Sequence, residues 1–288
     1  MAMAKITVYS FSGSQWAGVV HLTLAEKGFT KELDYHVQDV DIGAADNFDP
    51  AYLEINPNGT IPSLTSTSLP APLSESTDIL RYLDSLRENN PLVPKAAKSK
   101  TKGQQIIDLV HSSAVDTNII FFDARDVEEL DNKKSNWQKR FIDTRQHRLE
   151  QEHATHPAHP FYNRKLKENG ILYTAYQNTD GAADAAFFSR SNHCYIEFAA
   201  GLDQLESLLE LPYAVGNQIT EADFHVIPWL SHAMVAAGSN RSEIHNFSAL
   251  ESTIQKSVDG FKVGPRTREW WANVARTSSF KTVFPSLR

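Results

Sequence analysis

Three neighbouring residues, Ser74, Glu75 and Ser76, have the chemistry of a site for a charged ligand. They open a predicted helix with the sequence S-T-D-I-L-R-Y-L-D-S-L. A helix N-terminus carries unpaired N–H groups and about half a positive charge, so it attracts a carboxylate. Serines also cap helices that bind nothing. The sequence leaves both roles open, and the two are compatible.

A second group with possible chemistry is the histidine series His153, His156 and His159. Three histidines can hold zinc, but the two prolines that follow His156 and His159 interrupt a regular helix. No acidic partners that would orient the imidazoles are evident nearby. We therefore interpret this stretch as a polar surface loop and predict no metal site.

The elements that would position these residues form a short alternation of strands and helices. Residues 6–11 and 31–40 are predicted strands, the second with Leu33, Tyr35 and Val37 alternating. The segment Q-W-A-G-V-V-H-L-T-L-A-E-K-G between them has helical spacing and ends at Gly28. A helical turn at 50–55, two short strands, I-P-S-L-T-S and A-P-L-S, and the helix that buries Ile79, Leu80, Leu83 and Leu86 complete a β-α-β-α-β-β-α unit.

Beyond a Pro-bearing linker at 89–100, the sequence has helical periodicity. One apolar stripe runs from Ile106 to Phe121, and another from Tyr195 to Leu209. In I-T-E-A-D-F, Thr220 and Asp223 predict a capping box. The interval 124–192 is polar and charged, and its stretch D-A-R-D-V-E-E-L-D-N-K-K reads as a solvated segment.

Composition limits the possible partners. The 288 residues carry 28 Lys plus Arg against 35 Asp plus Glu, a net charge of −7, which disfavours nucleic acid and anionic membranes. A single cysteine, Cys194, excludes an internal disulfide and reads as a buried small hydrophobe. The N-terminus lacks a signal-peptide core, and no stretch reaches the ~18 apolar residues of a membrane helix. We expect a soluble, cytoplasmic protein.

Four motifs in order resemble the cytosolic glutathione transferases: S-Q-W-A-G-V-V-H-L-T-L-A-E-K-G, N-P-N-G-T-I-P-S-L, L-S-E-S-T-D-I-L-R-Y-L and I-T-E-A-D-F. The resemblance covers roughly 1–88 and 193–288, and it is to a long, serine-type, fungal-like form. It implies an α/β thioredoxin-like glutathione-binding domain (1–88), a linker (89–100) and an all-helical domain (101–288) with an insertion near 124–192.

The resemblance also implies a glutathione site. Ile61 before a cis Pro62 would bind the cysteinyl backbone of glutathione, Ser76 its γ-glutamyl carboxylate, and Glu75 its γ-glutamyl amine. The competing interpretation of Pro62 is an edge-strand proline with a trans bond. Ser14 would be catalytic and would donate a hydrogen bond to the glutathione sulfur, favouring the thiolate nucleophile.

Two other hydroxyls, Tyr9 and Ser12, compete for the catalytic role. Gln15 stands where the family usually has proline. Because no cysteine lies at this turn, we predict conjugation rather than thiol transfer. The resemblance places a second-substrate pocket between the domains, with Trp16, Ser113, Thr117 and Phe121 as candidates for its lining; the aromatic residues suggest an aromatic or hydrophobic electrophile, although they would serve equally as core.

Three functions stay open. The first is a glutathione transferase acting on small electrophiles, with glutathione as co-substrate and no metal. The second is a glutathione-dependent aryl (beta-)etherase or peroxidase on the same scaffold, and the third is a non-catalytic ligand-binding protein. The resemblance further implies a homodimer.

Overall fold

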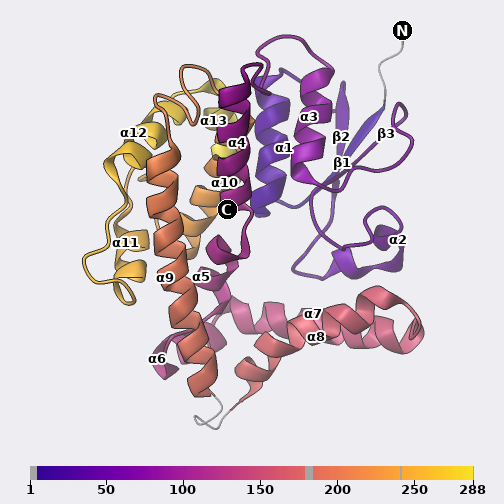
Figure 1. The fold of residues 1–288 in the computed structure, drawn as a ribbon. Coiled ribbons are helices and arrows are strands. Elements are labelled where there is room, and N and C mark those ends of the chain that lie inside the picture. Colours follow the sequence, from indigo (N-terminus) through magenta and orange to yellow (C-terminus); the bar gives the residue numbers. More distant parts are fainter. Residues whose placement is uncertain (1–4, 179–183, 241, 288) are drawn as a thin grey trace.

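The computed structural model describes residues 5–178, 184–240 and 242–287, which form a small sheet unit followed by a helical domain (Figure 1). The N-terminal elements are β1 (Ile6–Ser10), α1 (Gln15–Glu26), β2 (Tyr35–Asp39), α2 (Pro50–Leu53), β3 (Ser63–Ser66) and α3 (Ser76–Ser85). The sheet order is β2-β1-β3, with β2 parallel and β3 antiparallel to β1. Helices α1 and α3 pack against each other beside the sheet. This is the predicted thioredoxin-like arrangement.

Three local expectations in this unit are wrong. The strand expected at A-P-L-S is reduced to a single bridge between Leu64 and Leu73, consistent with the missing amide hydrogen of the preceding Pro72. Leu33 is 75% exposed, because Thr30 and Asp34 close a turn (Thr30 N to Asp34 Oδ2, 2.7 Å) before β2 begins. Leu86 is 42% exposed because it follows the last turn of α3.

The helical domain surrounds α10, whose residues are almost all buried. Its helices are α4 (Ala97–Val110), α5 (Asn118–Phe122), α6 (Val127–Lys134), α7 (Trp137–Thr155), α8 (Pro160–Gln177), α9 (Asp184–Leu208), α10 (Glu221–Ala236), α11 (Ser248–Gln255), α12 (Pro265–Val274) and α13 (Ser278–Val283). Helix α4 thus begins inside the interval expected as linker. The stripe from Ile106 to Phe121 is divided among α4, a 3-10 turn and α5.

Two signals in the helical domain are confirmed. The stripe from Tyr195 to Leu209, which runs along α9 and ends one residue after it, is buried in the core. The capping box at Thr220 and Asp223 starts α10, with the Asp223 carboxylate also accepting from the Trp270 indole and the Ala214 amide, each at 2.8 Å. A folding role therefore explains the whole motif.

The interval 124–192 is mostly helical, contrary to its polar appearance. D-A-R-D-V-E-E-L-D-N-K-K contains α6, and it is not a solvated segment throughout. The Arg125–Glu129 ion pair (2.6 Å) is nearly buried, and Arg125 stacks 3.9 Å from the centre of the Tyr195 ring. Burial alone would raise the pKa of Glu129, but hydrogen bonds from Arg125 and Lys256 lower it to about 2.

Helices α7 and α8 form a hairpin that returns to the N-terminal unit beside α2 (Figure 1). Phe161 and Tyr162 pack with Phe48, and the Tyr162 hydroxyl donates to the Phe48 carbonyl at 2.9 Å. A Cβ on Gly59 would lie 2.7 Å from the Phe161 ring, so the hairpin requires glycine there. The α7–α8 hairpin therefore packs at a defined position against the thioredoxin-like unit.

Among the described residues, no helix is both long and apolar enough to cross a membrane.

Candidate functional site

A cavity of about 380 Å³ brings together most of the residues predicted to bind glutathione. Its wall contains Trp16, Asn58, Thr60, Ile61, Pro62, Ser74, Glu75, Ser76, His111, Arg164, Lys165 and Glu168. These residues come from five separate parts of the chain: the start of α1, the loop before β3, the start of α3, the end of α4, and α8.

The Ile61–Pro62 bond is cis, as predicted. The loop before it is held by side chains of the N-terminal unit. The Tyr52 hydroxyl donates to the Thr60 carbonyl at 2.6 Å, as does Asn56 Nδ2 at 2.8 Å. Asn47 Nδ2 donates to the Gly59 carbonyl at 2.6 Å. Hydrogen bonds from these three side chains thus hold the N-P-N-G-T loop in place, and its residues Asn58 and Thr60 line the cavity.

Ser14 is the N-cap of α1 and lies against this loop. Its hydroxyl donates to the Ile61 carbonyl and accepts from the Ala17 amide, both at 3.4 Å. Of the competing hydroxyls, Ser12 is exposed in the turn, and Tyr9 is directed to Tyr52, with 6.1 Å between ring centroids. Ser14 alone joins a helix N-terminus to the cis-proline turn.

The start of α3 has free polar groups. Ser76 is its first residue and is 4% exposed, whereas the N-cap Glu75 is exposed and makes no capping hydrogen bond through its side chain. Thr77, next along the chain, shares a 3.3 Å hydrogen bond with His225 Nε2 of α10. Glu75 and Ser76 both line the cavity, and the Glu75 side chain makes no hydrogen bond or ion pair within the described part of the chain.

Two histidines and Trp16 connect α1, the end of α4 and α10, and Trp16 and His111 also line this cavity. His111 Nε2 lies 2.8 Å from His225 Nδ1, and the Trp16 ring stacks on His111 with 3.8 Å between centroids. Burial lowers the pKa of His111 to about 4 and holds that of the fully enclosed His225 well below its usual value. Both rings are therefore neutral at pH 7, and their contacts with each other and with Trp16 connect the two domains.

The opposite wall comes from the α7–α8 hairpin. Arg164 and Lys165 face the cavity from α8 and share Glu168, with N–O distances of 3.9 and 2.8 Å. This wall carries one net positive charge. The start of α3 lines the same cavity, so two of the elements that line it contribute positive groups.

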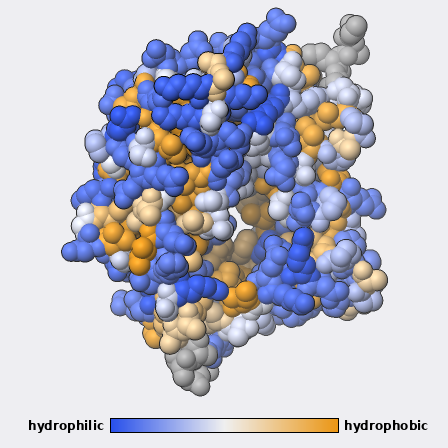
Figure 2. All heavy atoms as spheres, in the orientation of Figure 1, coloured by the Kyte–Doolittle hydropathy of each residue, from blue (hydrophilic) through white to orange (hydrophobic). Residues whose placement is uncertain are grey.

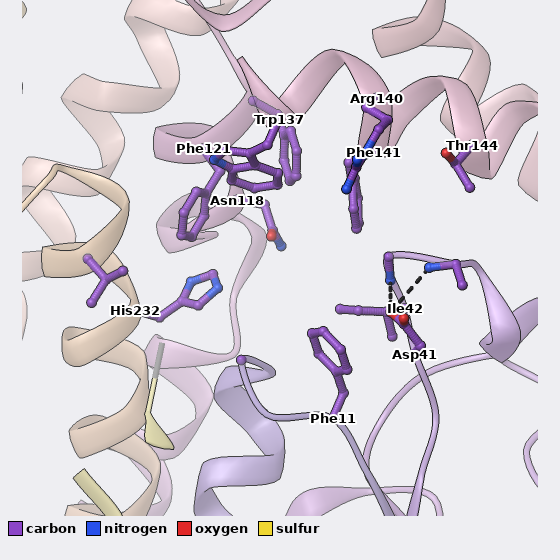
Figure 3. Close-up of a pocket in the computed structure, with 15 residues that line it drawn as sticks. Phe11, Asp41, Ile42, Asn118, Phe121, Trp137, Arg140, Phe141, Thr144 and His232 are labelled. Atoms are coloured by element: carbon purple, nitrogen blue, oxygen red, sulfur yellow. Dashed lines mark hydrogen bonds between the residues drawn. The ribbon is translucent and has the colours of Figure 1, made fainter. Parts of the chain in front are cut away.

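A larger cavity of about 770 Å³ adjoins the turn before α1, which contributes Phe11 and Gly13, and it has an aromatic lining. The space-filling view has a hollow between the two units with hydrophobic atoms inside it (Figure 2). The lining includes Phe11, Gly13, Asp41, Ile42, Asn118, Phe121, Phe122, Trp137, Arg140, Phe141, Thr144 and His232. Figure 3 shows these rings around one space, with His232 reaching toward it from α10. A flat apolar ligand fits such a lining.

A buried polar chain links this cavity to the start of α1. The Thr117 hydroxyl donates to Gln15 Oε1 at 2.7 Å, and it lies 2.7 Å from His232 Nδ1. Because the hydroxyl proton goes to Gln15, Thr117 accepts from the His232 Nδ1–H. Burial lowers the pKa of His232 to about 4, so its ring is neutral. Gln15, found where proline was expected, thereby anchors α1 to the helical domain.

The four residues proposed for the second-substrate pocket do not lie together. Phe121 lines the aromatic cavity, but Trp16 lines the smaller one. Thr117 is fully buried and lines neither cavity, and Ser113 is exposed outside both. Sequence reasoning missed Phe11, Trp137, Arg140, Phe141 and His232. The spacing of Trp137 and Phe141, four residues apart, could have indicated an aromatic helix face, but the pair lies in the polar interval 124–192.

Other candidate groups have structural explanations. His156 is 3.3 Å from Glu152, and His159 Nδ1 accepts from the Phe161 amide. Over the described ranges, no cluster of three or more His, Cys, Asp or Glu residues is placed to hold a metal. Cys194 is half-buried against the core, and burial raises the pKa of its thiol.

The comparisons with known proteins agree with this fold. Residues 8–91 match the family described as "Glutathione S-transferase, N-terminal domain". Over the whole chain, the structure resembles a maleyl pyruvate isomerase described as a bacterial zeta-class glutathione S-transferase, with 18% identity, a TM-score of 0.58 and 98% of each chain covered. It also resembles glutathione transferase F2 of Populus trichocarpa, with 17% identity, a TM-score of 0.57 and 97% of each chain covered. The chain therefore has the two-domain fold of the glutathione transferases.

The sequence matches to two curated relatives each cover 38% of this chain. Glutathione S-transferase Z1 of Arabidopsis thaliana is 32% identical over 108 residues, which are 38% of this chain and 46% of that protein. Glutathione S-transferase 1 of Dianthus caryophyllus is 30% identical over 109 residues, 38% of this chain and 47% of that protein. The matches thus span about half the length of these curated relatives.

Proposed function

We propose that the protein is a serine-type glutathione transferase, of the long, fungal-like form, acting on small aromatic electrophiles. One observation carries the proposal: the Ser14 hydroxyl, at the start of α1, lies 3.4 Å from the carbonyl of Ile61, and Ile61 shares a cavity with Glu75 and Ser76. One solved structure with this fold, a glutathione transferase homologue from Sulfitobacter, is described with bound glutathione.

In the proposed complex, glutathione lies across the smaller cavity. The Ser76 amide and hydroxyl bind the γ-glutamyl carboxylate, Glu75 binds the amine, and the Ile61 main chain binds the cysteinyl unit. Arg164 and Lys165 on the opposite wall attract the second carboxylate. The Ser14 hydroxyl turns from the Ile61 carbonyl to the sulfur. Its hydrogen bond, with the N-terminus of α1, lowers the thiol pKa.

The chemistry is a substitution at carbon. The thiol proton leaves to solvent, the sulfur lone pair forms a C–S bond, and the leaving group departs with the electrons of its bond to carbon. Gly13, beside Ser14, lines the aromatic cavity, so an electrophile held there faces the thiolate. Ser14 is the proposed catalytic residue. Resemblance further suggests a cytoplasmic homodimer, and light scattering measures its mass.

A glutathione titration followed by thermal unfolding tests the proposal, together with turnover of a panel of aryl halides, aryl ethers and peroxides. Glutathione that binds the folded state raises the melting temperature by mass action. Stabilisation with turnover supports an enzyme, and the best substrate separates a transferase from an etherase or a peroxidase. Stabilisation without turnover favours a binding protein. No stabilisation at millimolar glutathione contradicts the site.

A further inference from the structure

The aromatic cavity is lined by one cationic side chain, Arg140, that has no ion-pair partner within the described residues. Helix α7 carries four cationic side chains, Lys139, Arg140, Arg145 and Arg148. Three of them have partners: Lys139 pairs with Asp143, Arg145 donates to the Ile42 carbonyl, and Arg148 pairs with Asp49. Arg140 makes no hydrogen bond or ion pair within the described residues, and it is the one of the four that lines the cavity. In Figure 3 its guanidinium points into this space beside Phe141.

The charges around Arg140 leave it available to a ligand. Asp41 also lines the cavity, but its Oδ1 accepts from the Gly43 and Ala44 amides of its own loop at 2.8 and 3.2 Å. Arg145 lies 5.0 Å from the centre of the Phe141 ring, behind the same wall, and adds positive potential. The remaining polar lining, Asn118 and Thr144, is uncharged, and His232 is neutral at pH 7.

We propose that this cavity selects aromatic electrophiles that bear an anionic group, and that Arg140 is the residue that recognises the anion. The proposal rests on the proposed function and names its substrate class. The rings of Phe121, Trp137 and Phe141 bind the face of the aromatic ligand, while the planar guanidinium offers two parallel N–H donors to a carboxylate. Lys would not give this fork geometry.

Steady-state kinetics with two activated aryl chlorides test the inference. One is neutral, 1-chloro-2,4-dinitrobenzene, and the other is its anionic counterpart, 4-chloro-3,5-dinitrobenzoate. In each, C–S bond formation expels chloride. We expect the wild type to prefer the benzoate, and Arg140→Gln to raise its KM about tenfold, because a charge-assisted bidentate pair is lost. Turnover of the neutral chloride should change less than about twofold.

Lys139→Gln is the matched control, because it removes one positive charge from the same helix but outside the cavity. It should leave the preference for the benzoate unchanged. If Arg140→Gln prefers the benzoate as strongly as the wild type does, the inference about Arg140 is overturned, but the proposed transferase activity is not. An equal loss in both variants also overturns it, since general attraction would then explain the preference.

A binding measurement keeps the inference testable if neither chloride is turned over. Quenching of tryptophan fluorescence reports ligands near Trp137, so 3,5-dinitrobenzoate can be compared with 1,3-dinitrobenzene. Tighter binding of the benzoate that weakens with salt in the wild type, but not in Arg140→Gln, supports the anion site even when transfer fails. Salt-independent, equal binding of both ligands contradicts it.

Discussion

The two cavities beside the start of α1 differ in how they are built. The smaller one is largely polar, and most of its wall comes from three short motifs of the thioredoxin-like unit. The larger one is aromatic and takes its side chains from the turn after β1, the loop after β2, α5, α7 and α10. Where a site depends on main-chain groups at turns and helix ends, local sequence signals describe it. Where it depends on side chains from distant helices, they do not.

The largest expected effect concerns Ser14, the N-cap of α1. Substituting Ser14 by Ala removes the donor proposed for the thiolate, so kcat should fall on the order of 100-fold, as when one such donor is lost elsewhere. Glutathione affinity should change little, since its other contacts remain. Stopped-flow titration of the thiolate absorbance would show the pKa of bound glutathione rising.

Ser12→Ala is the control for this prediction, because Ser12 is exposed in the same turn and makes no hydrogen bond to Ile61 within the described residues. Undiminished turnover by Ser14→Ala would remove Ser14 from the proposed mechanism. Equal losses in both variants would indicate damage to the turn rather than to catalysis.

The same contrast explains what the sequence revealed. The cis bond at Pro62, the start of α3 at Ser76 and the capping box at Asp223 each depend on a few adjacent residues, and they were predicted. The pairing of Thr117 with Gln15 joins residues 102 positions apart, and no local pattern encodes it. The α7–α8 hairpin was missed because its contacts with the first unit are made by aromatic and cationic side chains in a polar sequence.

Acidification should lower the unfolding free energy through His232, which belongs to the buried chain of hydrogen bonds beside the aromatic cavity. His232 has a folded pKa of about 4 against 6.5 for an ordinary histidine. The unfolded chain therefore binds the proton first, and the unfolding free energy should fall as the pH drops from 6.5 to 4, by about 3 kcal/mol from this residue.

His232→Gln isolates that contribution because glutamine does not titrate and can still donate to Thr117. Urea unfolding at pH 7 and pH 4.5 should show a smaller loss of stability in the variant than in the wild type. His111 and His225 are present in both proteins, so their effects cancel. Parallel losses would mean that His232 is not the titrating group.

The aromatic cavity should respond to loss of a ring without any effect on glutathione. Phe141 stacks on Phe122 with 5.2 Å between centroids and lines the cavity. Phe141→Ala should raise the KM for an aryl electrophile about tenfold, the equivalent of about 1.4 kcal/mol of ring contacts. The dissociation constant of glutathione, measured by calorimetry, should stay the same; a parallel loss would show that the two cavities are not independent.

The smallest expected effect tests whether the hairpin also completes the polar cavity. Arg164 and Lys165 are partly exposed and share Glu168, so replacing both by Ala should weaken glutathione binding only about threefold at low salt. Lys167→Ala, on an exposed face of the same helix, is the matched control. If these cations bind the glycyl carboxylate, the double variant should bind the glycyl ethyl ester of glutathione as well as the wild type does. An equal loss for glutathione and for the ester would instead assign the two cations a structural role in seating α8 against the loop before Pro62.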